Sequence, residues 1–282
     1  MMERLLVVDG SNLLFQMFYG MPARIPGPDG RPIQGTIGFV GALLKMIRRV
    51  EPTHVAVVFD GECHNDRCDL DEDYKANRPD YSQMPQEETP FCQLPDIYDA
   101  LDHLGICHRE TEDCEADDWM AAMAKAYGED REVVIASWDS DLWQMITKNV
   151  CVLRYRGENS VLCDESYIQN RLGIRPEQYA DHKSLTGDHA DNIRGAEKVG
   201  PKTAAALLQQ FGTLEEILER VGEIQKPSVR ESIQRCGPRL RVNKLLIRLD
   251  GQQPLPFAWE DMAWEYQGQT TTEVLRAIGL GR

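Results

Sequence analysis

The sequence predicts an α/β fold in which a mainly parallel central sheet is flanked by helices and followed by a helical lobe. Short apolar runs rich in Val, Leu and Ile alternate with helical patterns up to about residue 165, as is typical of a parallel sheet covered on both faces. Beyond that point the chain has mostly helical patterns. We therefore expect an α/β core over residues 1–165 and a helical lobe over residues 166–282.

The predicted strands are short runs of β-branched and other apolar residues. In chain order they are residues 4–8, 54–59, a short strand near Ile106, residues 132–138, and a final pair at 150–155 and 160–164.

The predicted helices lie between these strands. They cover residues 13–19, 35–50, 90–104 and 114–127, and a further helix is expected to begin at residues 142–146. Residues 61–89 interrupt the pattern, because they are polar, carry charges of both signs and contain little that could form a core.

Composition limits the possible classes of protein. The chain has 282 residues, 42% of them hydrophobic, and eight scattered cysteines, which we interpret as reduced thiols in a cytosol. The sequence contains no apolar run of about 18 residues, so we expect no membrane span, and the N-terminus is a poor signal peptide. We expect a cytoplasmic monomer. The net charge of −15, taken alone, argues against a nucleic-acid partner.

Aspartates stand at the ends of three separate apolar runs. "LLVVD" ends at Asp9, "VAVVFD" at Asp60, and "VVIASWDSD" at Asp139 and Asp141. Because the carboxyl ends of parallel strands line one crevice, where ligands bind, these side chains should converge.

The helix that opens with "CEADD" should bring three more acids to the same edge. Glu115 and Asp118 share a helical face, whereas Asp117 should point elsewhere unless the helix begins late. Each acid alone is better explained as a helix cap or a partner of the helix dipole. Seven together would repel strongly without cations, and oxygen ligands suit Mg²⁺ or Mn²⁺. Two such ions about 4 Å apart promote in-line phosphoryl displacement.

The stretch "LTGDHADNIRGAEKVGPKTA" combines acids with a phosphate-binding pattern. It supplies Asp188 and Asp191, and then a turn that enters a helix with Pro201 in its first turn. Exposed amides at a helix N-terminus bind phosphate, and Lys198 and Lys202 add charge. The turn alone is equally typical of an ordinary helix–helix connection, but the acidic pair directly upstream favours a phosphate site.

The order and spacing of several motifs resemble the 5′-nuclease family (flap endonuclease, 5′→3′ exonuclease). The chain is most similar to the N-terminal domain of bacterial DNA polymerase I and to stand-alone bacterial and phage relatives, and we expect a stand-alone nuclease. The motifs are "LLVVDGSN", "VVFDG", "YKANRP", "CEADD", "WDSDLWQM" and the stretch just quoted. The resemblance runs to about residue 215 and then fades.

The resemblance implies a PIN-like 5′-nuclease domain with a helical arch over about 61–89 and a helix–three-turn–helix over about 184–215. It implies two metal groups, and all nine carboxylates are present here. The first group is Asp9, Asp60, Glu115, Asp117 and Asp118, and the second is Asp139, Asp141, Asp188 and Asp191.

The resemblance also implies roles for residues outside the acids. Basic arch residues contact the scissile phosphate and the flap, in an arch expected to be mobile and to face solvent. Tyr74 either stacks on a base or packs within the arch. The helix–three-turn–helix grips duplex phosphates and in several members holds K⁺ on backbone carbonyls. The matching arch residues are Arg67, Lys75 and Arg78, and the matching duplex-binding residues are Lys198, Gly200, Lys202 and Thr203.

Two residues depart from the family pattern. Gln16 stands where many relatives carry an arginine, so one phosphate contact is absent, and Trp138 is bulkier than the small residue expected before Asp139. The acidic charge is a further difficulty. Two divalent ions would move the balance from −15 only to about −11, so DNA must meet a local basic strip. That strip would contain Arg67, Lys75, Arg78, Lys183, Arg194, Lys198 and Lys202.

The sequence thus leads to one main function and two alternatives. The main expectation is a structure-selective, divalent-metal-dependent 5′ nuclease that cuts DNA at single-strand/duplex junctions, such as flaps and 5′ overhangs, in primer removal and repair. The alternatives are a ribonuclease of the related acidic-site group and a junction-binding module of the same fold that does not cut.

Overall fold

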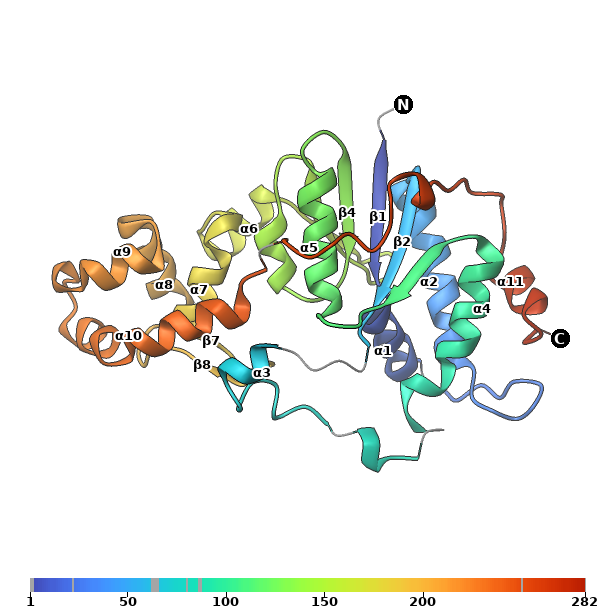
Figure 1. Ribbon diagram of the computed structural model, residues 1–282, viewed down its shortest axis with the longest axis horizontal. Helices are drawn as coiled ribbons and strands as arrows, with labels where there is room; N and C mark the ends of the chain where they lie inside the picture. Colours follow the sequence, from blue (N-terminus) through green and yellow to red (C-terminus); the bar gives the residue numbers. More distant parts are fainter. Residues whose placement is uncertain are drawn as a thin grey trace.

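The computed structural model describes residues 3–21, 23–61, 66–79, 81–85, 88–249 and 251–281. An α/β body and a helical lobe lie next to each other along the long axis of the molecule (Figure 1). The family-like architecture expected from the sequence is present: a central sheet, flanking helices and a separate group of helices.

The central sheet has six strands in the order β3-β2-β1-β4-β5-β6. The first five are parallel and β6 is antiparallel to β5, which confirms the mainly parallel sheet. The strand order reverses direction between β1 and β4, the point at which open α/β sheets bind ligands. The strands are β1 (Arg4–Asp9), β2 (His54–Phe59), β3 (Cys107–Glu110), β4 (Glu132–Ala136), β5 (Val150–Arg154) and β6 (Val161–Cys163).

Both faces of the sheet are covered, which explains why β1 and β2 have continuous apolar sequences rather than alternating ones. One face packs Leu6 and Val8 against α1 (Gly10–Gly20), α2 (Gln34–Val50) and α4 (Leu94–Leu104). The other packs Leu5 and Val7 against α5 (Ala116–Tyr127). This second cluster continues into the lobe, so body and lobe share one core.

Two predicted helices differ from the observed elements. The helix expected to begin at residues 142–146 is only one 3₁₀ turn, η4 (Asp141–Met145), because the backbone turns extended at Ile146 and β5 starts at Val150. The helix expected over residues 90–104 is split into η3 (Pro90–Gln93) and α4, since Pro95 occupies the first turn of α4.

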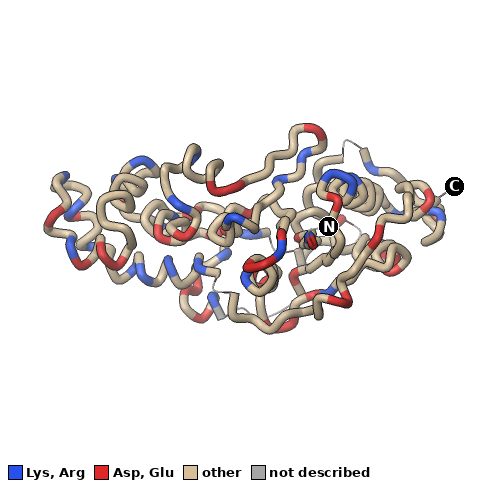
Figure 2. Tube along the Cα trace, turned by 90° about the horizontal axis from the view of Figure 1, so that it is seen from above, with Lys and Arg blue, Asp and Glu red and all other residues tan. Residues whose placement is uncertain are grey.

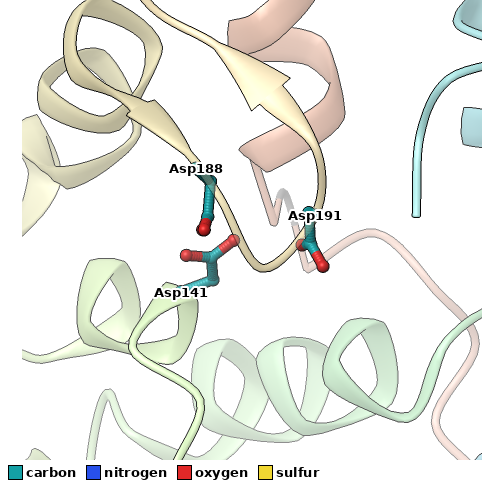
Figure 3. Close-up of side chains that lie close together, drawn as sticks. All are labelled: Asp141, Asp188 and Asp191. Atoms are coloured by element: carbon teal, nitrogen blue, oxygen red, sulfur yellow. The ribbon is translucent and has the colours of Figure 1, made fainter. Parts of the chain in front are cut away.

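The lobe is built from short helices around a small hairpin. Its elements are α6 (Glu165–Leu172), η5 (Pro176–Gln178), α7 (Tyr179–Thr186), β7 (Gly187–Asp188), β8 (Ile193–Arg194), α8 (Pro201–Phe211), α9 (Leu214–Glu219), η6 (Val221–Glu223) and α10 (Pro227–Ile247). The antiparallel β7–β8 hairpin carries two of the predicted ligands, Asp188 and Asp191, and brings them next to Asp141 (Figure 3).

The end of the chain does not belong to the lobe, contrary to the expectation for residues 166–282. Residues 251–281 return to the α/β body (Figure 1), where the indole nitrogen of Trp264 donates to the Leu104 carbonyl over 2.7 Å. The elements η7 (Glu260–Met262) and α11 (Thr271–Ala277) lie here. Val274 is fully buried in the core between α2 and α4, so apolar burial explains this return.

The predicted arch segment is only partly as expected. Its described parts are α3 (Asp66–Leu70), a turn over residues 72–77, and η1 (Tyr81–Gln83), while residues 62–65, 80, 86 and 87 lie outside the described residues. The expectation that the segment faces solvent is wrong for Tyr74, which is 6% exposed in a small apolar cluster with Ile193 and Leu246. Across the described ranges, no helix is both long and apolar enough to cross a bilayer.

Candidate active site

The carboxyl ends of β1, β2 and β4 bring acids together at one edge of the sheet. Asp9 is the last residue of β1, Asp60 directly follows β2, and Asp139 and Asp141 lie in the turn after β4. Asp60 and Asp139 are near enough to Asp9 to disfavour its ionisation. The structure thus places these side chains where the strand ends led us to expect them.

Hydrogen bonds from three backbone amides and one hydroxyl hold these acids in place. Asp9 accepts from the Asn12 amide over 2.9 Å and from the Ser137 hydroxyl over 2.7 Å. Asp60 accepts from the Ala116 amide over 2.9 Å, and Asp139 accepts from the Asp141 amide over 2.8 Å. The carboxylates therefore brace the loops that carry them, and nothing in the sequence singled out Ser137 for this role.

The N-terminus of α5 divides its three acids between two environments. Glu115 has extended backbone, so the helix begins only at Ala116. Asp117 then lies with the strand-end acids, because Asp139, Asp9 and Asp60 all disfavour its ionisation. This is the exception that the sequence left open, in which the helix begins late and Asp117 does not point elsewhere.

A second set of acids meets where the β7–β8 hairpin approaches the turn after β4. Carboxylate oxygens of Asp141, Asp188 and Asp191 all lie within 4.8 Å of one another (Figure 3). The Lys183 ammonium pairs with Asp188, which also accepts from the Ala190 amide over 2.9 Å. We call Asp9, Asp60, Glu115, Asp117 and Asp118 the strand-end group, and Asp139, Asp141, Asp188 and Asp191 the hairpin group.

Two glycines allow the hairpin to fold this tightly. A Cβ on Gly195 would lie 2.3 Å from the Thr186 carbonyl carbon, and Gly187 has φ +82°, where other residues are strained. The end of α7 and the segment directly after β8 therefore pack backbone to backbone, which fixes the base of the hairpin that carries Asp188.

Burial and mutual repulsion raise the pKa values of several acids. Burial, with a contribution from Asp60, raises the pKa of Asp9 to about 7. Burial followed by the charge of Asp139 raises the pKa values of both Asp117 and Asp141 well above the usual range. Burial also raises the pKa of Asp139. The hydrogen bond from the Asp141 amide favours the charged form and opposes this rise. Carboxylates in this state are stabilised by a cation.

The donor set fits a hard divalent ion. Within the described ranges, Oδ1 of Asp141 is buried and has no hydrogen-bond partner. An orphaned carboxylate oxygen is costly unless something binds it, and an oxygen-only donor set suits Mg²⁺ or Mn²⁺ better than zinc.

Basic residues of the arch segment pair directly with these acids. The Arg67 guanidinium, 11% exposed, donates to Glu115 over 2.7 Å and to Asp118 over 2.7 and 3.0 Å. Lys75 also pairs with Glu115, while Arg78 donates to Asp191 over 2.9 Å. Burial would raise the pKa of Glu115, but Lys75 and Arg67 hold it below its usual value. The arch cations thus serve as counter-ions in this conformation.

Tyr74 is positioned to support this arrangement rather than to stack on a base. Its ring is buried and its hydroxyl lies 3.4 Å from Glu115. Burial, followed by the charge of Glu115, raises the pKa of Tyr74 well above its usual range. Of the two roles expected from the sequence, the geometry favours packing within the arch.

The expected duplex-binding residues gather at the N-terminus of α8. Gly200 precedes the helix and has no side chain to cap its amides, and the Thr203 amide donates to the Gly200 carbonyl over 2.9 Å. Lys202 is exposed, and Lys198 is exposed with φ +63°. The structure thus places two cations beside an uncapped helix N-terminus, an arrangement that binds anions.

The two departures from the family pattern contact the same atom. The Gln16 side-chain amide and the Trp138 indole both donate to the Tyr155 carbonyl, over 2.9 and 2.8 Å. The Arg154 guanidinium lies over the Trp138 ring at 4.6 Å. These residues therefore form one polar contact between α1, the turn after β4 and the end of β5, which single-residue inspection of the sequence did not reveal.

Two protein-family descriptions match consecutive parts of this chain. The description "5'-3' exonuclease, N-terminal resolvase-like domain" matches residues 4–173, and "5'-3' exonuclease, C-terminal SAM fold" matches residues 174–270. The second match shows that the resemblance extends well beyond residue 215, where we expected it to fade.

Curated relatives and solved structures agree with these matches. The chain is 35% identical to DNA polymerase I of Rhizobium leguminosarum over 94% of its own length and 26% of that protein. It is 35% identical to thermostable DNA polymerase I of Thermus aquaticus over 89% of its length and 29% of that protein. The chain therefore spans little more than a quarter of these relatives.

Among solved structures, the T5 5′-exonuclease with bound zinc has TM-score 0.73 and 23% identity, over 88% of this chain and 90% of that chain. A bacteriophage T5 D15 flap endonuclease, in a pseudo-enzyme-product complex with DNA and metal ions, has TM-score 0.73 and 22% identity over 88% and 89%. At this identity the likeness shows the fold.

Proposed function

Because the chain belongs to the 5′-3′ exonuclease family, we propose that it is a structure-selective 5′ nuclease that hydrolyses DNA phosphodiesters with divalent metal ions. The observation that carries this proposal is the meeting of the hairpin group, in which oxygens of three aspartates lie within 4.8 Å of one another. In this proposal the strand-end and hairpin groups hold two or more Mg²⁺ or Mn²⁺ ions. Such ions, when bound, activate a water and neutralise charge on the phosphoryl oxygens.

The protein's own contribution is to orient the phosphate and to manage charge. Arg67 and Lys75 exchange their carboxylate partners for the scissile phosphate once cations neutralise the acids, and Arg78 does the same beside Asp191. Guanidinium groups suit this exchange, because their fork of donors matches carboxylate and phosphate oxygens equally well.

The proposed substrate is DNA with a 5′ single-strand/duplex junction, such as a flap or a 5′ overhang. The N-terminus of α8, with Lys198 and Lys202, is suited to grip duplex phosphates at a distance from the acids. K⁺ on nearby backbone carbonyls belongs to the same proposal. Roles in primer removal and repair fit the DNA polymerase I relatives and belong to the same proposal. The proposal further includes a monomer in the cytoplasm.

A labelled 5′-flap substrate tests the proposal against its alternatives. Wild-type protein should release the flap with Mg²⁺ or Mn²⁺ and not with EDTA, whereas Asp139→Asn should bind the substrate without cutting it. Asp139 is the residue for this test because its charge acts on acids of both groups.

Matched DNA and RNA junctions separate the remaining possibilities. Binding without cleavage by the wild type would identify a non-cutting junction module. Cleavage of RNA but not DNA at the same junction would identify a ribonuclease. Cleavage that survives in Asp139→Asn would contradict the assignment of the site.

A further inference from the structure

A polar pocket lies beside the hairpin, outside the two acidic groups. It has a volume of about 370 Å³ and opens between β8, α10 and the turn at residue 73. Three arginines line it: Arg194 from β8, and Arg235 and Arg239 from α10. Lysines and arginines recur along the lobe, where α10 lies (Figure 2). We call this the arginine pocket.

The first two arginines are available to a new anionic partner. Arg194 is exposed and makes no ion pair with any residue in the described ranges. Arg235 pairs with Glu197 over 2.6 Å, but both side chains are largely exposed, at 67% and 75%. A pair this exposed contributes little stability, so a phosphate can replace the carboxylate.

The third arginine connects the pocket to the arch segment. Arg239 pairs with Asp71, whose side chain is 9% exposed, and Asp73 also lines the pocket. These two acids and Glu197 keep the arginine pocket from being strongly basic in the free protein. This balance suits a site that binds one phosphate within an extended contact rather than a free anion of high charge.

The wall of the pocket holds an unpaired polar group. Ser232 is 4% exposed and lines the pocket, and its hydroxyl has no hydrogen-bond partner within the described ranges. Buried hydroxyls normally find a partner, so a bound phosphate with its ordered water would complete this site.

The arginine pocket continues toward the catalytic acids. A neighbouring pocket of about 290 Å³ is lined by Asp188 of the hairpin group and shares Asn192, Arg194 and Gly195 with the arginine pocket. Arg194 pairs with Gly187 across the hairpin, directly before Asp188. A DNA strand that runs along this hairpin from Asp188 would therefore meet Arg194 before the rest of the arginine pocket.

We propose that the arginine pocket binds one backbone phosphate of the DNA and positions the strand relative to the hairpin group. This inference rests on the proposed function. Arg194 and Arg235 supply the donors, and because Arg194 lies on the same two-stranded hairpin as Asp188, the bound phosphate has a fixed distance from the catalytic acids.

The test uses the full-length protein with Arg194→Gln and Arg235→Gln combined. Arg241→Gln is the matched control, because Arg241 also lies on α10 and pairs with an exposed acid, Glu215, over 3.0 Å. Affinity for a 5′-flap duplex is measured by fluorescence anisotropy in Ca²⁺ over a range of salt. The double variant should bind about five- to tenfold more weakly, and its salt slope should fall by about 0.9, as expected for one lost phosphate contact. The control should match the wild type in both quantities.

Single methylphosphonate substitutions then locate the contact. Neutralising one particular phosphate should weaken binding by the wild type and the control, and should have no further effect on the double variant. A merely structural role for the arginines would not produce dependence on a single phosphate.

Each result decides a different question. An unchanged salt slope, or a methylphosphonate profile that the double variant shares with the wild type, would overturn the inference about the arginine pocket. A wild type that neither binds nor cuts any junction would instead overturn the proposed function. Equal melting temperatures for the three proteins exclude misfolding as the cause of weaker binding.

Discussion

Replacing Asp9 by asparagine should stabilise the metal-free protein at neutral pH and abolish its activity. Asp9 is 6% exposed, and burial together with Asp60 raises its pKa to about 7. An asparagine keeps both contacts of the carboxylate, since it accepts from the Asn12 amide and donates to the Ser137 hydroxyl. The change Asp9→Asn therefore removes a charge with little change of shape.

The magnitude follows from the shift of this pKa. The ordinary pKa of an aspartate carboxyl is 3.8 and that of Asp9 is raised to about 7, so between these values the folded protein binds the proton and the unfolded chain does not. Stability therefore falls as pH rises from about 4 to about 7, and the loss is complete above pH 7. A shift of about three units corresponds to roughly 4 kcal/mol as an upper limit.

Thermal unfolding with and without Mg²⁺ measures this effect. In EDTA at about pH 7.5, Asp9→Asn should melt higher than the wild type, by up to about 8 °C at roughly 2 °C per kcal/mol. The difference should nearly disappear at about pH 4, where the wild-type carboxyl is protonated in the folded state and roughly half protonated in the unfolded chain. Mg²⁺ should raise the melting temperature of the wild type more at pH 7.5 than at pH 5.5, because protons compete with the ion.

The refuting result is a difference in melting temperature between the two proteins that does not change with pH. It would show that Asp9 is ionised at ordinary pH without an energetic penalty, so that the acidic edge does not require a cation. An equal Mg²⁺ effect in the wild type and Asp9→Asn would place the ion elsewhere. Repeating the melting measurement with Ca²⁺ in place of Mg²⁺ provides a second comparison of the two proteins.

Three further changes separate metal binding, DNA binding and folding. Asp191→Asn should reduce metal-dependent turnover at least about 100-fold with little effect on duplex affinity. Lys202→Ala should instead weaken duplex binding about tenfold and leave the maximal rate almost unchanged. Cleavage kinetics and fluorescence anisotropy on one flap substrate measure both effects. Lys198→Gly should weaken duplex binding without lowering the melting temperature, because glycine tolerates φ +63°, while destabilisation would contradict that reading. Asn243→Leu should lower the free energy of unfolding by about 2–4 kcal/mol in a denaturant titration, since the buried side-chain amide donates hydrogen bonds to two backbone carbonyls. Retention of full stability would show that those hydrogen bonds contribute nothing.

Local patterns were sufficient to predict the sheet and the position of the acids. The buried runs before Asp9, Asp60 and Asp139 identify parallel strands, and the geometry of such a sheet places their carboxyl ends together. The same logic did not reach Ser137 or the shared contact of Gln16 and Trp138, because these depend on hydrogen bonds between distant segments.

The arch segment and residues 251–281 show a second limit of sequence reasoning. Residues 61–89 lack a core of their own, but Tyr74 completes its burial against Ile193 and Leu246 from the lobe. Val274 likewise completes a cluster built by the first half of the chain. Composition within a window does not report partners that lie 100 or more residues away, so the sequence does not predict either contact.

The return of residues 251–281 to the body has a consequence for biosynthesis. The core between α2 and α4 receives Val274, and Trp264 donates to the end of α4, so the N-terminal half cannot complete its packing until residues 264–274 have left the ribosome. The sheet and its acidic edge therefore stay partly folded while the lobe is being synthesised. During that interval the partly folded body exposes apolar surface. Translation rate and chaperone binding should therefore influence the yield of native protein.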